Sequence, residues 1–144
     1  MKILSIETSC DDTAVAVLEA EDNKFNTLAN VVSSQSIHQK YGGVFPMMAK
    51  REHQRNLPII LKQALKEGKL LISNPQLLIP NKKIEILKKI LEKESNLFEE
   101  LVKFLQKYEK PDVDTIAVTI GPGLEPCLWV GINLAKALSY FWNI

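Results

Sequence analysis

The opening of the sequence constrains the fold more than any other segment. Two short runs rich in β-forming residues, 3–9 and 13–18, flank the polar triplet Cys10-Asp11-Asp12. This pattern is typical of a β-hairpin with an acidic turn. A third run at 27–32 follows a polar segment, and residues 33–39 are polar enough to leave the sheet. We therefore expect the chain to begin with an antiparallel three-stranded meander.

A long amphipathic helix is predicted after the loop signal Tyr41-Gly42-Gly43. Pro46 suits its first turn, where a missing N–H has no cost, and Gly68 suits its end. Pro58 lies inside this span and lacks a backbone donor, so we expect either a kink there or a helix that begins near Asn56. The apolar residues that define the helix recur at helical spacing: Leu57, Ile60, Leu61, Ala64 and Leu65.

The last part of the sequence predicts a strand, a tight loop and a helix. The strand covers 115–120, Gly121-Pro122-Gly123 forms the loop, and the helix covers 126–142. The order of elements is then β-β-β-α, an insertion, and β-α. This order predicts an α/β fold whose mixed sheet begins with antiparallel strands and gains a crossover strand later.

Residues 69–110 differ from the rest and are predicted to be a helical insertion. They carry nine of the eighteen basic residues together with six acidic ones, and the breakers Asn74-Pro75 and Pro80-Asn81 lie near their start. We expect one helix over 84–93 and a second helix capped by the pair Asn96 and Glu99. Because acids alternate with lysines, a solvated helical hairpin packed on the main body is favoured over a basic binding patch.

Charge and cysteine content narrow the classes of function. The chain has 144 residues, the size of one domain, and its net charge of +1 removes whole-molecule charge as an argument for binding nucleic acid or an anionic membrane. Cys10 and Cys127 are too few for a secreted disulfide framework and match no zinc spacing. No signal-peptide core or membrane span begins the sequence. We expect a cytoplasmic protein without a membrane partner, in which both cysteines are packing residues.

Three segments could carry chemistry. In the first turn, the Ser9 hydroxyl and backbone amides could hold phosphate oxygens while Asp11 or Asp12 aligns a metal or a proton, although acidic residues are also ordinary in turns. Gly121 and Gly123 precede a helix N-terminus, which favours an anionic group, although a plain tight turn is equally compatible with their spacing.

The third segment is a basic cluster at the start of the first long helix, containing Lys50, Arg51, His53 and Arg55. Such a cluster could contact the phosphates of a nucleic acid, or it could be a solvated helix face. His38 and His53 do not have the spacing of a metal motif.

Several motifs, in order along the chain, resemble one family, the TsaD-type tRNA N(6)-adenosine threonylcarbamoyltransferases. The stretches that carry the resemblance are Ile6-Glu7-Thr8-Ser9-Cys10-Asp11-Asp12-Thr13, Tyr41-Gly42-Gly43-Val44-Phe45-Pro46 with Ala49-Lys50-Arg51-Glu52-His53, and Gly121-Pro122-Gly123-Leu124 with Gly131. The resemblance implies an actin-like (Hsp70-like) ATPase lobe. It also implies an acyltransferase that moves the threonylcarbamoyl group of threonylcarbamoyl-adenylate to the N(6) amine of the adenosine beside the anticodon, in tRNAs that read codons beginning with A.

The resemblance also implies roles for individual residues and partners. Asp11 and Asp12 would be catalytic. Ser9, Gly121 and Gly123 would bind the adenylate, and the basic cluster defined above would lie near tRNA or a partner. The implied partners are tRNA, a paralogous scaffold subunit and an ATPase subunit. One iron or zinc ion is implied as well, with no ligand in this chain.

The sequence also departs from the family pattern. Asp12 replaces a common Glu, Met47 stands where a Glu usually follows the Pro, and the family's His-x-x-x-His motif and second lobe lie beyond the point that matches Ile144. We therefore expect residues 1–144 to be an N-terminal lobe that is inactive alone, with apolar surface exposed at Trp129, Phe141 and Trp142. The alternatives are a non-catalytic scaffold subunit of the same modification complex and the lobe of an actin-like small-molecule kinase.

Overall fold

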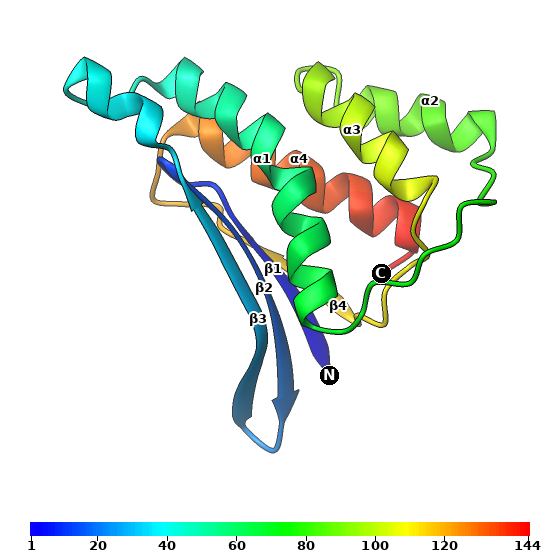
Figure 1. Ribbon diagram of the computed structural model, residues 1–144. Helices are drawn as coiled ribbons and strands as arrows, with labels where there is room; N and C mark the ends of the chain where they lie inside the picture. The colour runs from blue at the N-terminus through cyan, green and yellow to red at the C-terminus, as the bar shows by residue number, and fades with distance from the viewer.

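The first three strands form the predicted antiparallel meander. In the computed structural model, which describes residues 1–144, β1 (Lys2–Glu7), β2 (Asp12–Glu21) and β3 (Lys24–Ser34) pair in succession. The β2–β3 hairpin turns at Asp22 and Asn23, whose φ angles of 45° and 63° suit a two-residue hairpin turn. Both strands are longer than expected because they continue to this turn as a projecting ribbon (Figure 1).

The fourth strand makes the sheet mixed, as the sequence predicts. β4 (Thr115–Val118) pairs with β1 in parallel, so that Ile6 lies opposite Val118, and the strand order is β3-β2-β1-β4. The chain between β3 and β4 passes through the helical layer, which covers one face of the sheet (Figure 1). Because β1 and β4 are parallel, their C-terminal ends lie side by side.

Two long helices cover the sheet. After the short 3₁₀ helix η1 (Ser36–Tyr41), α1 (Pro46–Glu67) runs through Pro58 without interruption, and α4 (Glu125–Trp142) follows β4. The alternative of a helix beginning near Asn56 is therefore wrong. Figure 1 shows the axis of α1 bending in its middle. Such a bend is expected where Pro58 lacks the backbone N–H that would donate a helical hydrogen bond to the preceding turn.

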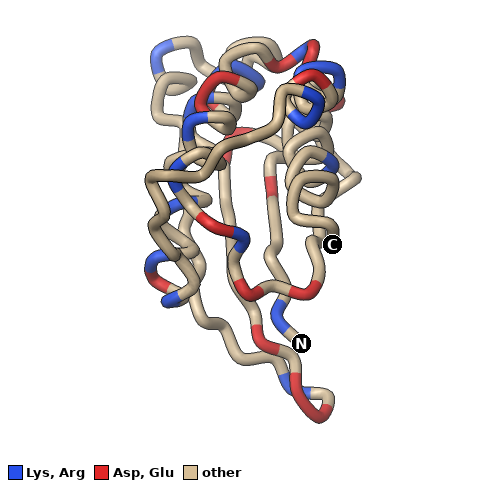
Figure 2. Tube along the Cα trace, turned by 90° about the vertical axis from the view of Figure 1, so that its right-hand side faces the viewer, with Lys and Arg blue, Asp and Glu red and all other residues tan.

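Residues 69–110 contain a helical hairpin that packs on the main body. It consists of α2 (Asn81–Ile90) and α3 (Ser95–Leu105), which lie against α4 and α1. The predicted capping pair is wrong, because α3 begins at Ser95 and has no side-chain cap, so that Asn96 lies inside its first turn. Lysines and acids are interspersed on these helices (Figure 2).

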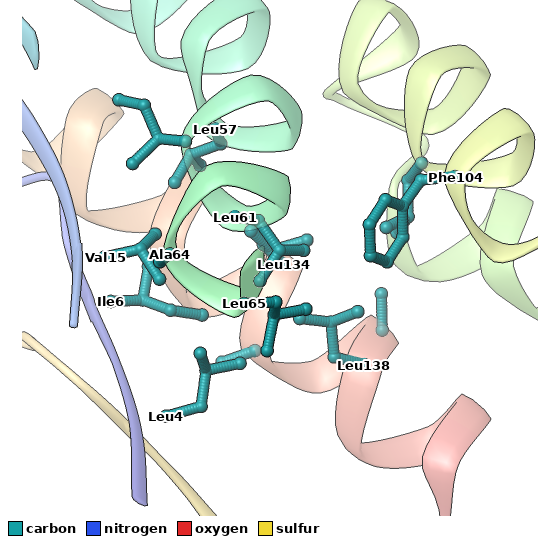
Figure 3. Packing of buried hydrophobic residues seen from close by; sticks show 14 of the residues in the cluster. Leu4, Ile6, Val15, Leu57, Leu61, Ala64, Leu65, Phe104, Leu134 and Leu138 are labelled. Atoms are coloured by element: carbon teal, nitrogen blue, oxygen red, sulfur yellow. The ribbon is translucent and has the colours of Figure 1, made fainter. Parts of the chain in front are cut away.

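One hydrophobic cluster joins both layers. It includes Leu4 and Ile6 of β1, Leu61 of α1, Phe104 of α3 and Leu138 of α4, which converge in Figure 3. The helical hairpin therefore shares the core of the sheet and does not have a core of its own.

The C-terminal aromatic residues differ in exposure. Trp142 belongs to the cluster and is only 3% exposed, which corrects the expectation of an exposed side chain, whereas Trp129 is 43% exposed. Phe141 is partly buried, with the Lys83 ammonium over its ring. No helix of the protein has the length and apolar character that crossing a bilayer requires.

Candidate functional site

The acidic turn between β1 and β2 lies against the glycine loop between β4 and α4. The backbone amide of Leu124 donates a hydrogen bond to the Ser9 carbonyl oxygen at 2.7 Å. A Cβ at Gly123 would lie 2.6 Å from the same oxygen, closer than two such atoms can approach. Glycine is therefore required at position 123, and the two loops that the sequence singled out separately form one site.

A buried threonine anchors the turn to α4. The Thr8 hydroxyl donates to the Cys127 carbonyl oxygen at 2.9 Å and accepts from the Gly131 amide at 3.2 Å. A Cβ at Gly131 would lie 2.5 Å from the Thr8 hydroxyl oxygen. Thr8 is only 1% exposed, so these bonds fix the end of β1 on the first turns of α4.

Glu7 is a charged group of the site to which the sequence analysis assigned no role. Its carboxylate accepts a hydrogen bond from the Ser9 amide at 2.5 Å. Partial burial alone would raise the pKa of this carboxyl, but hydrogen bonds from Ser9 and Thr119 outweigh it and lower the pKa below its ordinary value. Glu7 therefore stays ionised beneath the turn. Its position directly before Thr8 and Ser9 is the sequence signal that could have identified Glu7 as part of the site.

The two aspartates of the turn differ in exposure, and both lack an ionic partner. Asp12 is exposed, and Asp11 is half-buried. The main chain beneath them is fixed, because the Gln35 amide donates to the Asp11 carbonyl oxygen at 3.0 Å. Burial and the neighbouring Asp11 raise the pKa of the Cys10 thiol, so Cys10 is not a thiolate nucleophile at neutral pH. The turn thus presents carboxylates on an ordered backbone.

His53 lies inside the protein, whereas the sequence analysis expected it near tRNA or a partner. It has no exposed surface, and its ring is hydrogen-bonded to the Thr13 hydroxyl at 2.8 Å and to the Cys10 carbonyl oxygen at 3.0 Å. Burial lowers the pKa of this imidazole below its ordinary value. The side chain is therefore neutral at pH 7 and supports the acidic turn from below.

Lys50 joins the helical hairpin to α1. Its ammonium lies 3.2 Å from one oxygen of Glu94, whose side chain is 1% exposed, and the other oxygen accepts a hydrogen bond from the Asn133 amide at 3.0 Å. Of the remaining basic residues, Arg51 and Arg55 are exposed, and Arg55 pairs with Glu52 at 2.8 Å. The structure thus divides the predicted basic cluster into two surface arginines and two residues with internal partners.

A cavity of about 320 Å³ lies beside this ion pair, not at the acidic turn. Lys50, Glu94, Trp129 and Asn133 contribute to its walls, and the lysines and glutamates that line it are equal in number. No group of three or more His, Cys, Asp or Glu side chains converges as a metal site anywhere in the chain.

The sequence is similar to known proteins over most of its length. A sequence model of the family described as TsaD, tRNA N6-adenosine threonylcarbamoyltransferase, matches residues 26–77 and 88–144. Proteins named tRNA N6-adenosine threonylcarbamoyltransferase from Persephonella marina and Thermosipho melanesiensis are 38% and 39% identical over 144 residues. These alignments cover 99% of this chain but only 30% and 31% of the relatives. The chain thus spans about a third of the length of the curated relatives it matches.

The chain also resembles a solved structure. YeaZ from Pseudomonas aeruginosa aligns with a TM-score of 0.49 and 14% sequence identity, covering 99% of this chain and 42% of that protein.

Proposed function

Because the chain belongs to the tRNA N6-adenosine threonylcarbamoyltransferase family, we propose that it is the N-terminal lobe of such an acyltransferase, with an actin-like ATPase architecture. The reaction would transfer the threonylcarbamoyl group from threonylcarbamoyl-adenylate to the N(6) amine of an adenosine in tRNA. The amine attacks the carbonyl carbon of the mixed anhydride, a C–N bond forms, the C–O bond to phosphate breaks, and AMP leaves. We propose that this lobe needs the rest of such a protein for activity.

One observation supports this proposal above all: the carboxylates of the acidic turn, neither of which forms an ion pair, lie on an ordered backbone beside the glycine loop. A carboxylate beside an attacking amine can orient it and take its proton. The N-terminal end of the α4 dipole offers a partial positive charge to a leaving phosphate. We assign the ordering of the reacting groups to Asp11, a secondary role to Asp12, and contact with the adenylate to Ser9, Gly121 and Gly123.

The partners follow from the same proposal. Arg51 and Arg55 are the exposed cations of the first helix, so we propose that this face approaches tRNA or a partner subunit. The scaffold and ATPase subunits implied by the family would complete the complex in the cytoplasm. We propose that the iron or zinc ion that the family implies binds residues outside this chain, because the resemblance places the family's His-x-x-x-His motif beyond the point that matches Ile144.

The test is threonylcarbamoyl transfer to tRNA by the whole protein that contains this lobe, assayed with its partner subunits. We expect Asp11→Ala to lower the rate of transfer about 10²- to 10⁴-fold, the usual contribution of a positioned acid or base. Glu21→Ala is the matched control, because it removes an exposed carboxylate at the opposite end of β2. Transfer by the Asp11→Ala protein at the unmutated rate would favour the scaffold alternative, and phosphorylation of a small molecule without transfer would favour the kinase alternative.

A further inference from the structure

Three consecutive carbonyl groups of the acidic turn are each held by a different part of the fold. The Ser9 oxygen accepts from the Leu124 amide at the start of α4, and the Asp11 oxygen accepts from the Gln35 amide after β3. The Cys10 oxygen between them accepts from the His53 ring in α1 at 3.0 Å. Two of the three donors are backbone amides. His53 is therefore the one donor of the three that a side-chain substitution can remove.

The hydrogen bonds of His53 define its tautomer. A carbonyl oxygen can only accept, so the Nε2 atom that faces Cys10 carries the ring proton. A neutral imidazole has one N–H, and its Nδ1 atom must then accept from the Thr13 hydroxyl at 2.8 Å. Thr13 and His53 are both fully buried, so water does not compete for either bond. Thr13 thus supports the tautomer that the turn requires.

The bond to Cys10 acts directly on Asp11. The Cys10 carbonyl belongs to the same peptide plane as the Asp11 amide, and this plane sets the direction in which the Asp11 side chain leaves the backbone. The bonds on either side, at Ser9 and Asp11, hold the flanking planes. Without the imidazole, the central plane would be free to rotate between two fixed neighbours.

From this arrangement we propose that His53 is a positioning residue: its neutral Nε2–H tautomer, supported by Thr13, holds the Cys10 carbonyl and so aims the Asp11 carboxylate at the reacting groups. The kinetic part of this inference rests on the proposed function. The alternative is that His53 is a satisfied core residue whose loss affects stability alone. The two roles differ in whether activity depends on the hydrogen bond to Cys10 or on the stability of the whole lobe.

The experiment compares His53→Gln with His53→Leu in the whole protein, using threonylcarbamoyl-adenylate and tRNA as substrates. The glutamine amide can still donate to the Cys10 oxygen, whereas leucine cannot. We expect His53→Leu to lower kcat about 10- to 100-fold with little change in KM, as misplacement of a reacting group does, and His53→Gln to recover most of it. Leu101→Ala, a buried substitution in α3 remote from the turn, controls for lost stability.

Nitrogen-15 NMR of the imidazole provides a readout independent of activity. We expect the proton on Nε2, and we expect His53→Leu to shift the Cys10 carbonyl and the Asp11 amide resonances. A proton on Nδ1, equal loss of kcat in His53→Gln and His53→Leu, or equal loss in Leu101→Ala would overturn the inference. If the unmutated protein transfers nothing, the proposed function fails, while these resonances still decide whether His53 holds the turn.

Discussion

At the scale of single residues, Gly123 sets how closely the glycine loop approaches the acidic turn. An alanine there would place its Cβ against the Ser9 backbone, which cannot move aside because its carbonyl is bonded to Leu124. We expect Gly123→Ala to lower the free energy of unfolding by about 1–3 kcal/mol, the usual cost of overpacking. Urea denaturation measures this change. Gly43→Ala is the control, since its Cβ would meet nothing within 4 Å, and an equal loss in both variants would contradict the explanation.

A second prediction at this scale concerns pH. Because burial lowers the pKa of folded His53 below the ordinary value of 6.5, the unfolded chain binds this proton more readily. The contribution of His53 to the unfolding free energy should therefore be constant above pH 6.5 and should decrease below it, by at most about 1.4 kcal/mol per pH unit for one proton. Groups near the ring also act on it: Glu7 and Asp11 oppose this shift, and His38 adds to it.

Denaturation of the unmutated protein and of His53→Gln between pH 5 and pH 7 measures this effect, with the pH range chosen around the ordinary histidine pKa. The variant should lose the part of the slope that belongs to this imidazole. Glu7 does not confuse the result, because the lowered pKa of its carboxyl confines its own effect to the range below its ordinary value of 4.5. Identical slopes in the two proteins would show that His53 is protonated as easily in the folded state as in the unfolded chain.

The burial of His53 could have been predicted from the helical spacing, although the apolar residues predicted for this helix began only at Leu57. Stepping back four residues from Leu57 gives His53, and another four gives Ala49, so all three share the face of α1 that packs on the sheet. The charge of the basic cluster suggested a surface position for His53, but the helical periodicity of α1 correctly indicates that it is buried. The ordered backbone around Asp11 had no such signal, because it depends on bonds from Gln35, His53 and Leu124, which are distant in sequence.

At the scale of elements, one buried ion pair joins the helical hairpin to α1 and α4. Glu94 is almost completely buried, while the Lys50 side chain keeps 15% of its surface exposed. Lys50→Met should therefore leave an uncompensated buried carboxylate and lower the unfolding free energy by about 3–5 kcal/mol. Glu94→Gln should cost less, because the lysine can turn toward solvent. Thermal or urea denaturation of both variants tests this order, and a larger loss in Glu94→Gln would contradict it.

The elements themselves were largely predictable. Periodicity identified the meander, the strand before the glycine loop and the helices, because each has one face in the shared core. At Pro58 the sequence left two alternatives open, and the structure has the one in which the helix continues through the proline, because the apolar face of α1 continues on both sides of it. The local capping rule failed at α3, which begins before Asn96 where Glu94 is held by Lys50 and Asn133. These two contacts are not visible in a window of neighbouring residues.

At the scale of the whole molecule, the single core makes residues 69–110 part of the same energetic unit as the sheet. Leu87, Leu97, Leu101 and Phe104 belong to the same cluster as the residues of the sheet. We expect one cooperative unfolding transition, in which circular dichroism and tryptophan fluorescence coincide. Hydrogen exchange should give the most protected amides of α3 and α4 the same opening free energy. Earlier exchange of α2 and α3 would instead identify them as a separate unit.

The three bonds on the acidic turn also determine when it can form during folding. The donors to its carbonyl oxygens come from later parts of the chain: first Gln35, then His53, and finally Leu124. The bond between Thr8 and the Gly131 amide also requires a residue near the end of the chain. Contacts between such distant residues form late, because closing the loops between them costs entropy before the contacts can repay it. The first loop to be synthesised is therefore completed last, and a ribosome must finish the chain through α4 before the acidic turn is ordered.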